Sequence, residues 1–195
     1  MRKLTVAEFV SLDGVMQAPG GVDEDMDGGF AYGGWTMPFW HDDLGANFMR
    51  EIGQCDTFLL GRKTWQTHGA AFDPMPVGDP FGDVMNNMRK YVVSTTLKSA
   101  TAWRNSTLIN KNVVDEIHKL KEQPGKDIYV DGSSVLVHTL AQNDLVDEYS
   151  LLFYPIVLGN GKKVFPAGFH TSLKLIETRS FPTGVVLMRY QPDRK

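Results

Sequence analysis

The stretch with the clearest chemical character in this chain covers residues 58–65. Apolar residues predict a buried strand that ends at Gly61, and Arg62, Lys63 and Thr64 follow at the start of a predicted helix. The free N–H groups of a helix N-terminus favour an anion, and glycine lets a ligand approach the backbone closely. The two cations and the hydroxyl add further donors. We therefore expect a phosphate group here, although the stretch could also be a solvated basic turn.

A second break of the same kind follows the apolar residues 127–130. Residues 131–134 (Asp-Gly-Ser-Ser) lead into a predicted helix, and their hydroxyls could hold a second phosphate, although serine is also a common helix cap. Residues 94–96 (Ser-Thr-Thr) end another predicted strand. Open α/β sheets bind ligands beyond the carboxyl ends of their strands. The breaks near residues 60 and 130 are therefore expected to converge on one dinucleotide.

Other residue patterns speak against metal or hydrolase chemistry. The acidic residues 23–28 resemble the start of a calcium loop, but Gly34 stands where an EF-hand needs a glutamate. The five histidines and the single Cys55 lack the spacing of zinc ligands. No Gly-x-Ser-x-Gly elbow is present. We expect no metal site. Trp35, Phe39 and Trp40 could stack on a flat ring or belong to the core.

Hydrophobic periodicity predicts an α/β protein. Strands are expected at 4–12, 56–60, 91–94, 107–109, 127–130 and 147–157, with a closing hairpin of 173–180 and 185–191. Helices are expected at 41–53, 62–66, 84–88, 113–122 and 133–141, and residues 17–38 are expected to form an irregular, functional loop. Strands alternate with helices up to about residue 150 and then follow one another. This order predicts a parallel sheet with an antiparallel edge.

Composition limits the class of protein. The chain has 195 residues, of which 42% are hydrophobic and 22% charged, and this suits a single domain over 1–195. A formal net charge of −3 disfavours a nucleic-acid partner. No apolar run approaches the roughly 18 residues of a membrane span. With one cysteine no internal disulfide can form. We expect a cytoplasmic protein with no membrane partner.

The motifs, in this order, resemble the dihydrofolate reductase superfamily. They are residues 10–16 (VSLDGVM), 60–65 (LGRKTW), 92–95 (VVST) and 130–134 (VDGSS). Residues 144–149 and 155–165 resemble the branch that contains the C-terminal reductase domain of the bifunctional riboflavin-biosynthesis protein. The resemblance implies a dihydrofolate-reductase-like, three-layer α/β/α fold with a central mixed sheet and a C-terminal antiparallel hairpin. It also implies NADPH as the cofactor and a homodimer.

The resemblance assigns a cofactor role to specific residues. The residues implied to bind the phosphate groups are Gly61, Arg62, Lys63 and Thr64, with the adenosine 2′-phosphate near Arg62 or Lys63. The adenosine side falls to Ser94 and Thr95, the pyrophosphate to Gly132, Ser133, Ser134 and Val135, and the nicotinamide and its ribose to Ala7, Asp13, Gly14 and Val15. An aspartate facing a pyrophosphate is unfavourable, so Asp131 is expected to point away from it.

The resemblance also implies a carboxylate early in the first helix, where Asp43 is the nearest match; Asp42 and Asp43 could instead simply start the helix. The expected reaction is hydride transfer from NADPH to a flat heterocycle or sugar-imine of the pyrimidine or pterin type. Asp43 or Asp13 would donate or relay a proton through water. The named activity implied is 5-amino-6-(5-phosphoribosylamino)uracil reductase. The alternatives are dihydrofolate reductase proper and a non-catalytic NADPH-binding protein.

Overall fold

Short runs of apolar and β-branched residues form the strands of the computed structural model, which describes residues 1–194. The strands are β1 (Leu4–Ser11), β2 (Cys55–Gly61), β3 (Arg89–Val93), β4 (Ser106–Ile109), β5 (Asp127–Asp131), β6 (Glu148–Tyr154), β7 (Leu173–Ser180) and β8 (Val186–Pro192). The helices are α1 (Asp42–Ile52), α2 (Arg62–Phe72), α3 (Pro80–Asn87), α4 (Val113–Glu122) and α5 (Ser134–Gln142). In this part of the chain no helix is both long and apolar enough to cross a membrane.

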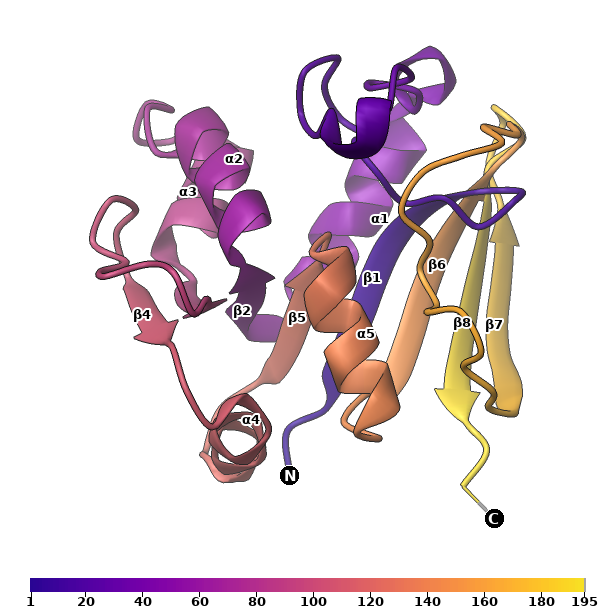
Figure 1. Ribbon diagram of the computed structural model, residues 1–195. Helices are drawn as coiled ribbons and strands as arrows, with labels where there is room; N and C mark the ends of the chain where they lie inside the picture. Colours follow the sequence, from indigo (N-terminus) through magenta and orange to yellow (C-terminus); the bar gives the residue numbers. More distant parts are fainter. Residues whose placement is uncertain (195) are drawn as a thin grey trace.

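The strands form one eight-stranded sheet in the order β4-β3-β2-β5-β1-β6-β8-β7 (Figure 1). The pairs from β4 to β6 are parallel, whereas β8 runs antiparallel to both β6 and β7. The mixed sheet with a C-terminal antiparallel hairpin is therefore confirmed. Helical crossovers connect the parallel strands, as the alternation of strands and helices predicts.

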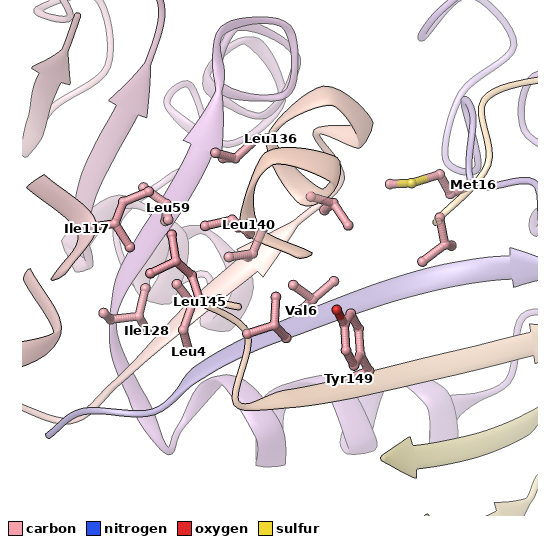
Figure 2. Packing of buried hydrophobic residues seen from close by; sticks show 14 of the residues in the cluster. Leu4, Val6, Met16, Leu59, Ile117, Ile128, Leu136, Leu140, Leu145 and Tyr149 are labelled. Atoms are coloured by element: carbon pink, nitrogen blue, oxygen red, sulfur yellow. The ribbon is translucent and has the colours of Figure 1, made fainter. Parts of the chain in front are cut away.

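Apolar side chains on the two faces of the sheet form separate cores. On one face, strand residues such as Val6 and Ile128 pack against Ile117 of α4 and Leu140 of α5 (Figure 2). On the other face, Phe58 and Leu60 of β2 pack with side chains of α1, α2 and α3. A third cluster joins loop 17–38 to the ends of β6 and β8. The helices thus cover both faces of the sheet, which gives the predicted three layers.

Three elements differ from their predicted bounds by three or more residues. The helix expected over 62–66 is α2, which continues to Phe72. The strand expected over 147–157 ends at Tyr154, because Pro155 has no N–H to donate to the sheet. The helix expected over 84–88 is α3, which starts at Pro80. Asp79 caps it by accepting a hydrogen bond from the N–H of Gly82 at 2.8 Å, and proline is favoured at the first helical position.

The centre of the sheet contains a crevice between β1 and β5. The two strands pair from Leu4 with Ile128 to Ala7 with Asp131, and β1 then continues along β6 as far as Ser11. The chain leaving β1 passes to β2 beyond β5, and the chain leaving β5 passes through α5 to β6 beyond β1. Neighbouring strands whose connections leave in opposite directions mark the place where such sheets bind ligands.

Lys90 on β3 is a fully buried cation within the second core. Its ammonium donates hydrogen bonds to the carbonyls of Asn86, Met88 and Arg104 at 2.8–3.2 Å and lies 4.3 Å from the centroid of the Trp103 ring. Burial lowers the pKa of Lys90 to about 8. The ammonium therefore joins the end of α3 to the segment that precedes β4.

Replacing this ammonium should destabilise the fold. Lys90→Met keeps the apolar stem but removes a donor from three carbonyls, of which that of Asn86 still accepts from the Asn105 amide, and we expect a loss of about 2–4 kcal/mol in the free energy of unfolding. Lys119→Met, at an exposed position on α4, should change it by less than about 0.5 kcal/mol. Urea denaturation measures both values. Equal stability of the two variants would contradict a structural role for the Lys90 ammonium.

Candidate functional site

The two glycine-led turns predicted to act together lie side by side. Because β2 pairs with β5, the turns that follow them meet at the same edge of the sheet. The Gly61 N–H donates a hydrogen bond to the Ser133 hydroxyl at 2.8 Å, and that hydroxyl donates to the Thr64 hydroxyl at 2.9 Å. The two breaks therefore form one continuous surface at the start of α2 and α5.

Small residues are required where these turns touch. Gly132 has a φ of +61°, and a Cβ there would lie 3.0 Å from the side chain of Thr64. A Cβ on Gly61 would lie 3.2 Å from the side chain of Ser133. Neither α2 nor α5 has a side-chain cap on its N-terminus. The first-turn N–H groups of both helices are therefore available to an anion.

A cavity of about 260 Å³ opens beside these turns, over the crevice between β1 and β5. One part of its lining is aromatic. The Phe48 and Phe81 rings stack at 5.8 Å between centroids, and the Phe9 ring meets Tyr154 edge-on at 5.7 Å. Stacked and edge-on rings suit a flat, apolar ligand face.

The other part of the lining is polar and titratable. His68 of α2 lies 2.9 Å from the Asp131 carboxylate at the end of β5. Glu8 of β1 accepts a hydrogen bond from the Gly132 N–H at 3.1 Å. Glu24, from the loop 17–38, lines the same cavity. With Asp25 of the same loop, four carboxyls and one imidazole thus surround a single space.

The environment shifts the pKa of Glu8, Glu24 and His68 toward the protonated form. Burial and the neighbouring Asp131 charge raise the pKa of Glu8 well above its usual value. Burial also raises the pKa of Glu24, opposed by hydrogen bonds from two glycine N–H groups. Burial opposes the charged form of His68, but the hydrogen bond to Asp131 and the charges of Asp131 and Glu24 together outweigh it and raise the His68 pKa. The cavity therefore retains protons that these groups would release in water.

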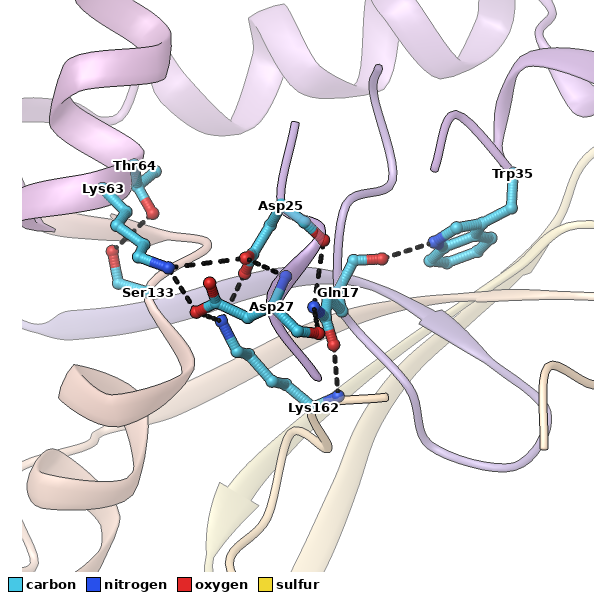
Figure 3. A network of polar contacts seen from close by, with 8 residues as sticks. All are labelled: Gln17, Asp25, Asp27, Trp35, Lys63, Thr64, Ser133 and Lys162. Atoms are coloured by element: carbon cyan, nitrogen blue, oxygen red, sulfur yellow. Dashed lines mark hydrogen bonds and ion pairs between the residues drawn. The ribbon is translucent and has the colours of Figure 1, made fainter. Parts of the chain in front are cut away.

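Loop 17–38 is tied to both sides of the cavity by ion pairs (Figure 3). Lys63 at the start of α2 pairs with Asp27 and lies 3.6 Å from Asp25, and Lys162 pairs with the same two carboxylates. Gln17 donates to the backbone carbonyls of Asp25 and Asp27 at 3.0 and 3.1 Å. The acidic residues of the loop are therefore paired with lysines and are not simply solvated. Hydrogen bonds from Lys162 and Lys63 lower the pKa of Asp27 to about 2.

The residues predicted for the cofactor lie along this edge of the sheet, at different distances from the cavity. Lining it are Lys63, Thr64, Gly132, Ser133 and Ser134. Arg62 lies next to the cavity, in a shallow depression that it shares with Asp27 and Lys63. Its guanidinium donates a hydrogen bond to the Gln66 side chain at 3.0 Å and forms no ion pair within residues 1–194. Outside the lining lie Ala7, Asp13, Gly14, Val15, Gly61, Ser94, Thr95 and Val135.

The two predicted proton carriers, Asp13 and Asp43, also lie outside the cavity lining. The Asp13 carboxylate accepts hydrogen bonds from the Ser11 hydroxyl at 2.6 Å and from the N–H groups of Leu158 and Gly159. These bonds, the one from Ser11 above all, lower the Asp13 pKa. The side chain of Asp43 is half exposed, 3.5 Å from His41 in the first turn of α1. Their proton-carrying role stays a prediction.

The comparisons with known proteins place this fold and cavity in a family. The sequence profile of the RibD C-terminal domain family matches residues 2–187. The chain belongs to this family. It is 32% identical to the uncharacterized protein YyaP of Bacillus subtilis (strain 168) over 97% of this chain and 94% of that protein. It is 28% identical to the uncharacterized protein YwjB of the same organism, over 95% and 96%.

Solved structures share the fold of this RibD C-terminal domain. A protein from Shewanella sp. PV-4 named for riboflavin biosynthesis has a TM-score of 0.76, 20% identity and 98% and 99% coverage of the two chains. A pyrimidine reductase-like protein from Corynebacterium diphtheriae has a TM-score of 0.66, 14% identity and coverage of 100% and 93%. A dihydrofolate reductase from Enterococcus faecalis, complexed with NADP(H), has a TM-score of 0.63, 15% identity and coverage of 98% and 97%. The dihydrofolate-reductase-like fold is thereby confirmed.

Sequence reasoning missed Glu8, Glu24 and His68, and it treated Asp131 only as an unfavourable neighbour of a phosphate. One signal was present. Glu8 is the charged residue in an otherwise apolar strand, on the same face as Val6 and Val10. An inward-facing carboxylate in a strand needs an explanation. Among residues 1–194, no three histidine, cysteine, aspartate or glutamate side chains group as a metal site.

Contact between the two turns can be tested with matched glycine variants. Gly132→Ala and Gly28→Ala both place an alanine at a φ between +60° and +70°, but only Gly132 has a neighbour within 4 Å. Both should lose about 1 kcal/mol of stability from the backbone strain. Gly132→Ala should lose about 1–2 kcal/mol more because Thr64 must move. Thermal and urea unfolding measure the difference, and equal losses would show that the turns do not press on each other.

The His68–Asp131 pair should be visible by NMR. In wild-type protein the imidazole of His68 should titrate above 6.5, and Asp131→Asn should lower its pKa because only the Glu24 charge then opposes burial. The pair stabilises the fold fully below about pH 6.5, and this stabilisation is lost as pH rises through the raised pKa. A titration assigned by the loss of its signal in His68→Gln measures the shift. An unchanged midpoint in Asp131→Asn would rule out the pair.

Proposed function

We propose that this RibD C-terminal domain protein is an NADPH-dependent reductase that acts on a pyrimidine or pterin-like substrate. The observation that carries the proposal is the meeting of two uncapped helix N-termini beside a cavity with stacked rings and with carboxyls whose pKa is raised by burial. The finer activity proposed is that of 5-amino-6-(5-phosphoribosylamino)uracil reductase. Family membership and the likeness of fold to reductases support it.

The residues present fit a dinucleotide. The first-turn N–H groups of α2 and α5 lack side-chain caps, and the contact between Gly132 and Thr64 leaves a surface without protruding side chains. Gly61, Lys63 and Thr64 would hold phosphate oxygens, and Gly132, Ser133, Ser134 and Val135 the pyrophosphate. Ser94 and Thr95 would lie on the adenosine side, and Ala7, Asp13, Gly14 and Val15 near the nicotinamide. When bound, the reduced dinucleotide supplies the hydride.

The two cations at the start of α2 differ in their availability. Lys63 is already paired with Asp27, so an anion there has to displace a carboxylate. Arg62 has no carboxylate partner within residues 1–194 and lies beside the same depression. A guanidinium binds a phosphate through two parallel hydrogen bonds. Arg62 is therefore the residue we assign to the adenosine 2′-phosphate.

The protein groups around the cavity orient the substrate and control its protons. Phe48, Phe81 and Phe9 would cover a flat ring, and Glu8 and the His68–Asp131 pair would meet its polar edge. Loop 17–38 lines one side of the cavity and is held there by the ion pair of Lys162 with Asp25, so it would shield these electrostatic contacts from water. Asp13 and Asp43 would need bridging water to reach a substrate, since neither lines the cavity.

The proposal is tested by titrating the protein with NADPH and NADH while following nicotinamide fluorescence. Turnover is then compared on 5-amino-6-(5-phosphoribosylamino)uracil and on dihydrofolate. Faster turnover of the ribosylamino-pyrimidine supports the proposal, and faster turnover of dihydrofolate favours a dihydrofolate reductase proper. Binding of NADPH without oxidation in a single turnover on either substrate would favour a non-catalytic binding protein. Absence of NADPH binding would overturn the assignment.

Arg62→Ala should discriminate between the two dinucleotides. We expect the Kd for NADPH to rise by about 10- to 100-fold, the ~1.5–3 kcal/mol typical of hydrogen bonds to a charged group, with little change for NADH. Arg104→Ala, an exposed arginine that pairs with Asp73 away from the cavity, is the control. An equal rise in the Kd of both dinucleotides would contradict the assignment of Arg62 to the 2′-phosphate.

Homodimerisation and a cytoplasmic location are further parts of the proposal and come from the resemblance and the composition. Sedimentation of the purified protein over a range of concentrations tests the dimer. A species of monomer mass at all concentrations would reject it.

A further inference from the structure

Glu8 is a carboxyl on a strand face whose neighbouring residues, Val6 and Val10, are apolar. It is the first β1 residue beyond the last pair with β5, so it faces the crevice where the two strands separate. Its side chain is buried, with the residue only 5% exposed. Oε2 accepts the Gly132 N–H at 3.1 Å, whereas Oε1 is buried without a hydrogen-bond partner among residues 1–194. A buried carboxyl oxygen left without a partner is costly unless a ligand or a proton satisfies it.

The titratable groups around Glu8 do not include a cation of its own. Asp131 at the end of β5 is paired with His68 of α2. Glu24, from loop 17–38, accepts the N–H groups of Gly20 and Gly21 at 2.7 and 3.1 Å. Among these three carboxyls, Glu8 is therefore the one that has no side-chain partner and has a buried oxygen without a hydrogen bond.

The remaining charges of the cavity are committed elsewhere. Lys63 and Lys162 are paired with Asp25 and Asp27. The segment before α1, α1 itself, α3 and β6 add only uncharged side chains to the lining: Trp40, Leu44, Phe48, Phe81, Met85 and Tyr154. A second negative charge beside Asp131 would thus lie in the cavity without a balancing cation.

We propose that Glu8 holds a proton in the crevice between β1 and β5 and donates it from Oε1 to the atom of the substrate that becomes reduced. This role rests on the proposed reductase function. In reduction of a C=N bond, the carbon receives a hydride from the reduced dinucleotide and the π-electron pair moves to nitrogen. The nitrogen takes the proton of Glu8, the O–H electron pair stays on the carboxylate, and solvent returns a proton to Glu8 in the next cycle.

The first test uses the protein without ligand and does not depend on the proposed function. Burial and the Asp131 charge raise the pKa of Glu8, so the folded protein keeps a proton that the unfolded chain releases above about pH 4.5. Wild-type stability should therefore fall, relative to Glu8→Gln, as pH rises. The folded-to-unfolded ratio of Glu8→Gln over wild type should grow by up to about tenfold per pH unit between about pH 5 and 7. Urea denaturation at each pH measures it.

A constant ratio across this range would show that Glu8 is ionised and would overturn the proposal. If Glu8→Gln does not fold, a 13C titration of glutamate carboxyls in the wild type decides the same point. One carboxyl that stays protonated at neutral pH is expected, and its absence would overturn the proposal equally.

The second test separates proton donation from a structural role. With NADPH and the ribosylamino-pyrimidine, Glu8→Gln should lower kcat by about 10²- to 10⁴-fold with KM changed less than about threefold, and Glu8→Asp should restore part of kcat. Glu51→Gln is the matched control. Glu51 is a half-buried carboxyl whose pKa is also raised by burial, but it bonds to Ser150 outside this cavity, so kcat should be unchanged.

The outcomes distinguish the donor role from the proposed function. A rise in KM with kcat unchanged would make Glu8 a residue that only positions the ligand, and an unchanged kcat and KM would leave it no part in the reaction. Either result overturns the proposal. If wild-type protein turns over neither substrate, the reductase function and the donor role fall together, while the pH series still decides whether Glu8 holds a proton.

Discussion

The hydroxyl of Ser133 connects two turns that are 72 residues apart in the chain, and the site depends on that connection. By accepting the Gly61 N–H and donating to Thr64, it holds the N-termini of α2 and α5 against one another. Each helix end alone is an ordinary feature of α/β proteins. Held together beside the place where β1 and β5 separate, they turn the edge of the sheet into one surface that favours an anion.

Charge is distributed unevenly around this surface. Carboxyls lie within the cavity, and the lysines at its mouth are already paired with Asp25 and Asp27 of the loop (Figure 3). An anionic ligand near Lys63 therefore competes with a carboxylate of the protein itself. This competition couples the position of loop 17–38 to binding at the start of α2, because the same two aspartates hold both Lys63 and Lys162.

The cavity combines two environments that flat heterocycles need. Phe48 and Phe81 form a stacked pair that offers an apolar face, while Glu8, His68 and Asp131 present donors and acceptors beside it. Low exposure makes each polar contact stronger than it would be in water, and it also shifts the protonation of the groups that make the contacts. In the proposed reductase, recognition of a ring edge and control of its protons would thus rest on the same few side chains.

The sequence by itself determined the order of the elements and the two glycine-led turns. The apolar runs that end at Gly61 and near Gly132 are local features, so a strand followed by a turn can be predicted at each without knowledge of distant residues. Element ends were predicted less well: β6 stops where Pro155 has no N–H to offer, and α3 begins at a cap and proline that the apolar pattern does not reveal.

Only the tertiary structure decided which titratable side chains share the cavity. Glu8, Glu24, His68 and Asp131 come from a strand, a loop, a helix and a strand end, and no spacing in the chain brings them together. Asp43, chosen because it starts a helix, stands half exposed beside His41. The protonation of such groups depends on burial and on neighbours within a few ångströms. Those distances are set only in the folded sheet, where β1 and β5 pair as far as Ala7 and Asp131 and then diverge.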